Sequence, residues 1–189
     1  MKVINLHKDE NSIIQQAIEN NRQAQHSLYK KYSPKMLSVC RFYIKDLHHA
    51  EDVMITAFMK VFTNLKSFER KGNFEGWIRR IMVNECIDFI RVKKNVFKTD
   101  EIEEYKHQEL DLVTEMHEFS VDNIQFMIDN LPDGCKTVFN LYAIEGFKHQ
   151  EIAEKLRISE GTSKSQLAHA RKLLQNQINQ LNAAENGTK

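Results

Sequence analysis

The sequence has no apolar run close to the roughly 20 residues that a membrane-spanning helix needs, and residues 1–8 lack the apolar segment of a signal peptide. We therefore expect a cytoplasmic protein without membrane insertion. Its three cysteines, Cys40, Cys86 and Cys135, are odd in number and far apart, so neither a disulfide framework nor a zinc motif fits them. We expect buried, reduced thiols.

Catalytic signatures are also missing. The sequence contains no glycine-rich phosphate loop, no nucleophile elbow and no His-Glu-x-x-His arrangement. His48 and His49 are adjacent, and neighbouring residues on a helix point in different directions, which argues against a metal pair. His107 and His117 lie among acidic residues, where solvated side chains are the simpler interpretation. We expect a protein that is not an enzyme and has no metal or cofactor.

The net charge of +1 hides a strongly uneven distribution. Thr99 to Gln125 contains nine acidic residues and one lysine, a net charge of −8, so the rest of the chain carries +9. Lys66 to Lys98 has nine basic and four acidic residues, and Lys155 to Leu174 has five basic and one acidic residue. Two basic modules therefore flank an acidic connector, a pattern that favours binding to nucleic acid.

Apolar residues recur at helical spacing along most of the chain, and no segment alternates as a strand would. Ser33-Pro34 suits the start of a helix, because proline is tolerated in a first turn, and Gly146 suits a helix end. We expect a helical continuation from Leu174 to Gln180 and a frayed end from Ala183. The spacing predicts helices over Glu10–Glu19, Ala24–Tyr32, Pro34–Ile44, His48–Leu65, Phe74–Val92, Val121–Asn130 and Asp133–Ile144.

The predicted fold is all-α, with two small helical domains at residues 10–94 and 121–180. A flexible acidic linker at residues 95–120 joins them. A helical segment within this linker, near Leu110 to Met116, is compatible with the sequence. The apolar content of 41% is sufficient for real cores.

The predicted helix His48–Leu65 has an unusual second face. Asp52, Ile55, Thr56 and Met59 lie near one another there, away from the regular apolar stripe. A solvated surface with incidental apolar side chains is one interpretation. A partner-binding face is the other, because adjacent exposed apolar groups favour association.

The predicted helix Phe74–Val92 combines aromatic and basic residues. Its apolar stripe contains Phe74, Trp77, Ile78, Ile81, Met82, Phe89 and Ile90. Its polar positions are Arg79, Arg80, Asn84, Asp88 and Arg91. Trp77 alone indicates a core residue, but together with these cations and the basic connection Lys66–Lys71 it makes a single-strand nucleic-acid surface plausible.

Two helical patterns separated by about three residues occupy His149 to Leu174, with small Ala153 where crossing helices must approach closely. This is the layout of a helix-turn-helix, whose second helix enters the DNA major groove. Ser159 is a natural N-cap. We expect Lys164 and Gln166 to contact base edges and Arg171 and Lys172 to contact phosphates. The full set of candidate contacts is Thr162, Ser163, Lys164, Ser165, Gln166, His169, Arg171 and Lys172.

With these residues in view, the chain resembles a bacterial sigma factor of the sigma-70 superfamily, of the extracytoplasmic-function (ECF) type that keeps only regions 2 and 4. The resemblance covers Leu28 to Lys94 and Val121 to Gln175. Three motifs carry it, in the order expected. They are Ala50-Glu51-Asp52-Val53 through Lys60-Val61-Phe62, then Phe74-Glu75-Gly76-Trp77-Ile78-Arg79-Arg80-Ile81 with Asn84 and Asp88, and then Glu151-Ile152-Ala153 through Ser159-Glu160-Gly161-Thr162 to His169-Ala170-Arg171.

The resemblance implies a promoter-specificity subunit of RNA polymerase, with a region 2 helical bundle and a region 4 helix-turn-helix. Asp52, Ile55, Thr56 and Met59 would dock on the clamp helices of the polymerase beta-prime subunit, and an anti-sigma factor is an expected regulator. The helix-turn-helix would read the −35 element as duplex. The −10 element would be melted and read by Lys66, Arg70, Lys71, Trp77, Arg80, Asn84, Asp88 and Arg91, with Asn84 and Asp88 near a flipped base and Trp77 mainly structural.

Several positions depart from the family pattern. Ile55-Thr56 stands where Gln-Glu is frequent, which shifts the expected polymerase contact toward apolar burial. Arg157 replaces a frequent turn glycine, at a cost of about 1 kcal/mol for a positive φ. Lys148 stands where a Ser or Thr cap is common, and Ser163 stands where valine often packs.

Two other functional classes stay open from the sequence. A helix-turn-helix regulator with a sensory N-terminal half would bind duplex DNA without polymerase. A helical enzyme would need a role for scattered histidines and acids, of which His48 and His49 are the ones to test.

Overall fold

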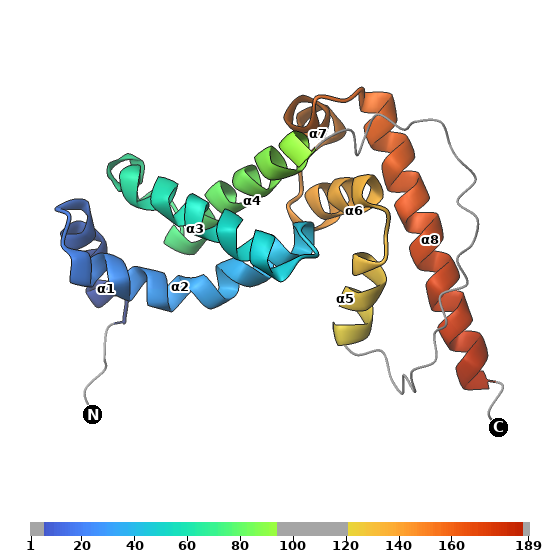
Figure 1. Ribbon diagram of the computed structural model, residues 1–189, viewed down its shortest axis with the longest axis horizontal. Helices are drawn as coiled ribbons and strands as arrows, with labels where there is room; N and C mark the ends of the chain where they lie inside the picture. Colours follow the sequence, from blue (N-terminus) through green and yellow to red (C-terminus); the bar gives the residue numbers. More distant parts are fainter. Residues whose placement is uncertain (1–5, 94–120, 187–189) are drawn as a thin grey trace. The chain divides into compact units, whose positions relative to one another are not determined.

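A computed structural model describes residues 6–93 and 121–186 of the chain, and within those ranges the regular structure is helical without any strand (Figure 1). The all-α prediction is therefore confirmed. The contacts divide the chain into two compact units, one ending at Phe89 and the other starting at Ile90. The predicted linker and its helical stretch near Leu110 to Met116 lie outside the described residues. No helix in the described ranges is long and apolar enough to span a bilayer.

The first unit is built from α1 (Leu6–Ile18), α2 (Arg22–Tyr43), α3 (Leu47–Thr63), the short 3₁₀ helix η1 (Leu65–Ser67) and α4 (Phe74–Lys93). α2 packs against both α1 and α3. Polar side chains set two of the helix starts, as expected for N-caps. Asn21 accepts hydrogen bonds from the backbone of Gln23 and Ala24 at 3.0 and 3.1 Å, and Asp46 accepts one from His49 at 2.8 Å.

The prediction of two helices meeting at Ser33-Pro34 is wrong, because α2 runs through Pro34 as one helix. Proline removes one backbone hydrogen bond from a helix interior and costs about 3 kcal/mol. Burial on both sides offsets that cost, since Leu28, Tyr32, Met36 and Cys40 follow one another at intervals of four residues and are all buried. The packing of this continuous buried face therefore outweighs the low helix propensity of proline.

The core face of α4 also differs from the prediction. Phe74, Ile78 and Met82 are buried as expected, whereas Trp77, Ile81 and Phe89 are only half-buried. Residues on the side that the pattern left out are buried instead, namely Val83, Glu85, Cys86 and Ile87. α4 is covered over more than one stripe, because α2, α3 and the loop before it all contribute side chains to its surroundings.

The buried carboxylate of Glu85 joins α3 to α4. Its Oε1 lies 2.5 Å from Lys60 Nζ, while the Glu85 side chain is 8% exposed and the Lys60 side chain 53%. A buried carboxylate needs such a partner to offset its lost hydration. The pair therefore ties the core side of α4 to the end of α3.

The second unit contains α5 (Val121–Asp129), α6 (Asp133–Phe139), a π-helical segment η2 (Asn140–Ile144), α7 (His149–Leu156) and α8 (Glu160–Asn186). The predicted helix to Ile144 therefore changes its hydrogen-bond pattern at Asn140. Gly146, with φ 76°, ends this stretch as predicted, and Phe147 N donates to Leu141 O at 2.9 Å.

α8 organises the second unit, because both α6 and α7 pack on it. Its core joins Leu131, Cys135 and Ala170, with Phe139, Leu173 and Leu174 against them. The helix extends to Asn186. The predicted fraying from Ala183 is therefore wrong for residues 183–186. All three cysteines are buried thiols outside any disulfide, as predicted, and burial raises the pKa of the Cys135 thiol to about 11.

Replacing Pro34 with alanine should raise the free energy of unfolding of the first unit by about 1–3 kcal/mol, because it restores the missing helical hydrogen bond. Trp77 is the single tryptophan of the chain and lies in this unit, so denaturant unfolding followed by its fluorescence measures the change. Lys30→Ala, an exposed position one turn earlier, should change the value by less than about 0.5 kcal/mol. Equal midpoints for both variants would show that α2 accommodates proline without loss.

Candidate nucleic-acid interface

The helix-turn-helix consists of α7, a turn at residues 157–159, and α8. Arg157 ends α7 in the left-handed conformation, with φ 56° and ψ 46°. The positive φ is the condition under which a cost of about 1 kcal/mol is expected, because glycine would adopt this conformation more easily. The turn is closed by a hydrogen bond from Ile158 N to Ala153 O at 3.1 Å.

Side chains on both helices satisfy backbone groups at the helix starts. Ser159 Oγ accepts a hydrogen bond from Thr162 N at 2.9 Å, which confirms the predicted N-cap. The N-cap residue of α7 is Lys148, whose side chain cannot accept a hydrogen bond. Glu151 compensates, because its Oε2 accepts from Lys148 N at 2.7 Å.

One face of α8 is exposed over its first four turns. We call it the outer face of α8, and it contains Lys164, Ser165, Ala168, Arg171 and Lys172. Each of the other four residues lies three or four positions from Ala168, so the set covers one side of the helix. Ala168 was not among the predicted contacts because it has no polar group. Its place between the cations could have been found from spacing alone.

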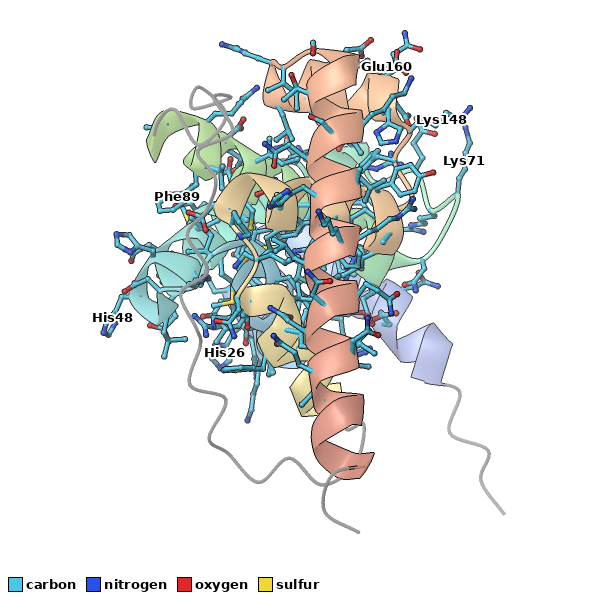
Figure 2. All side chains as sticks on the ribbon, turned by 90° about the vertical axis from the view of Figure 1, so that its right-hand side faces the viewer. His26, His48, Lys71, Phe89, Lys148 and Glu160 are labelled. Carbon is cyan, nitrogen blue, oxygen red and sulfur yellow. The ribbon has the colours of Figure 1, made fainter. Side chains whose placement is uncertain are left out.

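An acidic neighbour moderates the charge of this face. Glu160, which marks the N-terminal end of α8 in Figure 2, accepts a hydrogen bond from Lys164 Nζ at 2.8 Å. That hydrogen bond and the lysine charge lower the pKa of the Glu160 carboxyl. Both side chains are more than half exposed, so the pair is weak and Lys164 can leave it for another acceptor.

Other predicted contacts on α8 point inward. Ser163 is 0% exposed, and its Oγ lies 2.9 Å from His149 Nδ1. The His149 ring stacks on Tyr142, with centroids 4.7 Å apart and an interplanar angle of 25°. Ser163 is therefore removed from the set of DNA contacts, because its hydroxyl holds α7 against α8. It fills the place of the expected valine with a hydrogen-bonded pair.

Gln166, His169 and Thr162 are half-buried at the edges of the outer face. Gln166 Oε1 accepts a hydrogen bond from Cys135 Sγ at 2.9 Å, so its amide is oriented by α6. Thr162 Oγ1 lies 2.8 Å from Ser159 Oγ. Both polar groups have partners within the protein, which makes them weaker candidates for base contacts than Lys164.

A second polar surface lies along α4. Trp77, Arg80, Asn84, Asp88 and Arg91 are spaced by three and four residues and therefore share one side of the helix. Arg80 and Asn84 are exposed, and the other three are half-buried. We call this set the polar face of α4.

Trp77 belongs both to this face and to an aromatic cluster. Its ring stacks on Phe74, with centroids 5.7 Å apart and planes at 18°, and lies 5.5 Å from Phe68. Half of the tryptophan is therefore fixed by packing while the rest reaches the surface. A rigid, partly exposed ring of this kind suits both predicted roles, structural support and a stacking platform.

The 3₁₀ helix η1 and the loop between it and α4 carry the remaining predicted cations. Lys66, Arg70 and Lys71 are all exposed, and Figure 2 shows Lys71 extending away from the helices of its unit. Lys71 Nζ lies 2.8 Å from a Glu69 carboxylate oxygen. Arg70 has φ 56°, a left-handed conformation that is unfavourable for a residue with a side chain.

The predicted partner-binding face of α3 is on the surface. Asp52 and Thr56 are exposed, Ile55 is 51% exposed and Met59 is 64% exposed. Thr56 Oγ1 donates to Asp52 O at 2.9 Å, so its methyl group and the two apolar side chains dominate this side of the helix. Neighbouring exposed apolar groups of this size favour a protein partner.

Family models match both described units. Sigma-70 region 2 matches residues 28–96, and Sigma-70 region 4 matches residues 122–174. The ECF RNA polymerase sigma factor SigW of Bacillus subtilis is 30% identical over 179 residues, which cover 89% of this chain and 96% of that relative. The chain belongs to the ECF RNA polymerase sigma factors.

A second sequence relative agrees with this assignment. The sigma factor is 24% identical over 181 residues to the ECF RNA polymerase sigma-E factor of Haemophilus influenzae, with 90% of this chain and 95% of the relative covered. It also resembles the solved structure of the sigma factor RpoE with the anti-sigma factor NepR from Bartonella quintana, at 20% identity and a TM-score of 0.48, covering 82% and 96% of the two chains. The family models and the sequence relatives confirm the resemblance, and they show that the alternative of a regulator that acts without polymerase is wrong.

The inward position of Ser163 leads to a prediction for the sigma factor. Ser163→Ala should destabilise α7 and α8 by about 1–2 kcal/mol, because His149 Nδ1 loses its partner. Amide hydrogen exchange of the two helices measures this loss. The dependence of duplex affinity on salt should stay unchanged, because no phosphate contact is removed. Exposed Ser165→Ala is the matched control and should leave the exchange rates unaltered; a reduced salt dependence for Ser163→Ala would contradict the assignment.

Proposed function

We propose that three surfaces of this sigma factor divide the work of promoter-specific initiation. The face of α3 binds the polymerase core, the polar face of α4 and its preceding loop melt and read the −10 element, and the outer face of α8 reads the −35 duplex. The corresponding domains are residues 10–94 and 121–180. The observation that carries the proposal is that each of the two family regions contains one exposed basic surface.

The α3 assignment is supported by the exposed apolar pair Ile55 and Met59 beside Asp52. We propose that the clamp helices of the polymerase beta-prime subunit cover this face. Burial of two large apolar side chains is worth about 1.5–3 kcal/mol each. Asp52 would contribute orientation and partner choice more than affinity.

The α4 assignment is supported by its combination of an aromatic ring, cations and amide or carboxylate groups on one side of a helix. Unstacking and flipping a base costs a few kcal/mol. Stacking on an aromatic side chain returns about 1–3 kcal/mol per base, and cations attract the strand. In this proposal Trp77 and Arg80 supply these contacts, while Asn84 and Asp88 bond the edge of an extruded base.

The α8 assignment is supported by the small Ala168 between Lys164 and Arg171 on the outer face. A small residue lets the helix approach the base edges and offers its methyl group to thymine. Lys164 suits the acceptors of guanine. Arg171 and Lys172 suit phosphates and fix the position of the helix.

No covalent chemistry is needed from the sigma factor, because polymerase performs nucleotidyl transfer, so we propose that it is not an enzyme. Its place of action is then the cytoplasm, where the polymerase works. We also propose control by an anti-sigma factor, on the ground of family membership alone.

Transcription from promoter templates tests the proposal as a whole. The full-length sigma factor with purified core polymerase should give promoter-dependent transcripts from a genomic template library, whereas core polymerase alone should not. Absence of any such transcript would contradict the proposed function.

Lys164→Ala should weaken binding of the holoenzyme to its −35 duplex by about 1–3 kcal/mol, the usual value of one specific base contact. Glu160→Gln should strengthen binding, because it releases Lys164 and removes a negative charge. Anisotropy of a labelled duplex at fixed salt measures both changes. Lys172→Ala is the contrasting variant: it should weaken all sequences equally and reduce the salt dependence.

Met59→Asp should reduce affinity for core polymerase at least tenfold, because it replaces one of the two exposed apolar side chains of the α3 face with a charge. A competition assay against the wild-type sigma factor measures the loss. His26→Asp adds the same charge at an exposed site on α2 and should bind normally. Duplex binding by region 4 should be unaffected in both, and equal loss of both activities would contradict the assigned roles.

A further inference from the structure

The first helix of the chain lies outside the matched family region, which starts at residue 28. α1 is nevertheless an ordered part of the first unit, packed on α2 and on η1 (Figure 1). Ile14 and Ala17 are each 1% exposed. Gln25 Nε2 donates to Ala17 O at 3.3 Å and fixes the end of α1 to α2.

α1 also contacts the loop before α4 directly. Arg70 Nη2 donates a hydrogen bond to Gln15 Oε1 at 2.8 Å, across 55 residues of sequence. Arg70 lies at the tip of that loop in a left-handed conformation, which local preferences do not favour. A guanidinium has five N–H donors in a fixed fork, so one bond to Gln15 orients the remaining donors.

A second line of contacts runs from α1 to the start of α4. Glu10 accepts hydrogen bonds from Lys31 Nζ at 2.7 Å and from the Tyr32 hydroxyl. The Tyr32 ring meets Phe74 edge-on, with centroids 5.7 Å apart. The Phe74 ring in turn contacts the rings of Phe68 and Trp77. The loop between η1 and α4 is therefore connected at both ends to the helix pair α1–α2.

We propose that α1 is a positioning element for promoter opening: Gln15 holds Arg70 in the orientation that contacts the phosphates of the separated −10 strand. This rests on the proposed function of the loop and of the polar face of α4. Gln15 touches no DNA in this account. Its contribution is that the arginine fork is already oriented when the strand arrives, which lowers the entropy cost of binding.

The chain offers a closely matched set of variants. Gln15→Ala removes the acceptor, whereas Gln15→Glu keeps an acceptor and adds charge, which strengthens a bond to arginine. Gln16→Ala is the control, because exposed Gln16 bonds only locally, to Ser12 Oγ at 3.3 Å. Arg70→Ala sets the full effect of losing the arginine.

The measurement is the affinity of the complete holoenzyme for a forked promoter whose −10 strand is already single. Gln15→Ala should reduce this affinity about threefold to tenfold, in the range of one lost hydrogen bond to a charged group. Gln15→Glu and Gln16→Ala should both bind the forked promoter with the affinity of the wild type. The double variant Gln15→Ala/Arg70→Ala should bind no more weakly than Arg70→Ala.

Three controls decide the outcome. The unfolding midpoint from Trp77 fluorescence should be unchanged in Gln15→Ala, and a loss of affinity that follows a lowered midpoint and is not restored by Gln15→Glu would overturn the proposal. Normal affinity for Gln15→Ala beside a defective Arg70→Ala would overturn the role of α1 alone. Normal affinity for Arg70→Ala and Arg80→Ala would overturn the −10 assignment and the role of α1 together.

Discussion

The packing around Phe74 is the contact on which the first unit depends. This side chain is 4% exposed and its ring meets Tyr32 of α2, Phe68 of the loop and Trp77 of α4. Aromatic contacts of this kind add to the free energy of burial and restrict the relative orientation of their elements. The place where the basic loop becomes α4 is thereby fixed, and with it the direction in which the polar face of α4 points.

The second unit uses a polar contact for the same purpose. The buried pair of Ser163 and His149 joins the two helices of the helix-turn-helix, and Tyr142 covers the histidine ring. A satisfied buried hydrogen bond specifies one arrangement of helices, because every alternative leaves a polar group without a partner. The outer face of α8 makes few contacts within the protein: the Arg171 guanidinium lies 5.6 Å from the centroid of the Tyr142 ring, and Lys164 pairs with Glu160.

In both units, one side of a helix is buried in the core and the opposite side is exposed. Buried side chains on one side of α3, α4 and α8 hold each helix in place, and the other side carries the groups that we propose contact polymerase or DNA. Weak exposed pairs such as Lys164 with Glu160 do not oppose this, since a partner can replace them at little cost. The strained backbones of Arg70 and Arg157 both occur in the loops that link such helices.

Helical periodicity and capping are local properties, and the sequence alone determined what depends on them: the all-α class, the presence of α3, the Ser159 cap, the left-handed Arg157 and the motifs of the sigma factor family. Tertiary structure decided whatever depends on neighbours distant in sequence. Pro34 stays inside α2 because packing outweighs propensity, Ser163 turns inward because α7 covers it, and Val83, Cys86 and Ile87 are buried because α4 is enclosed on several sides. The bond from Arg70 to Gln15 has no local signal at all, since only folding brings these residues together.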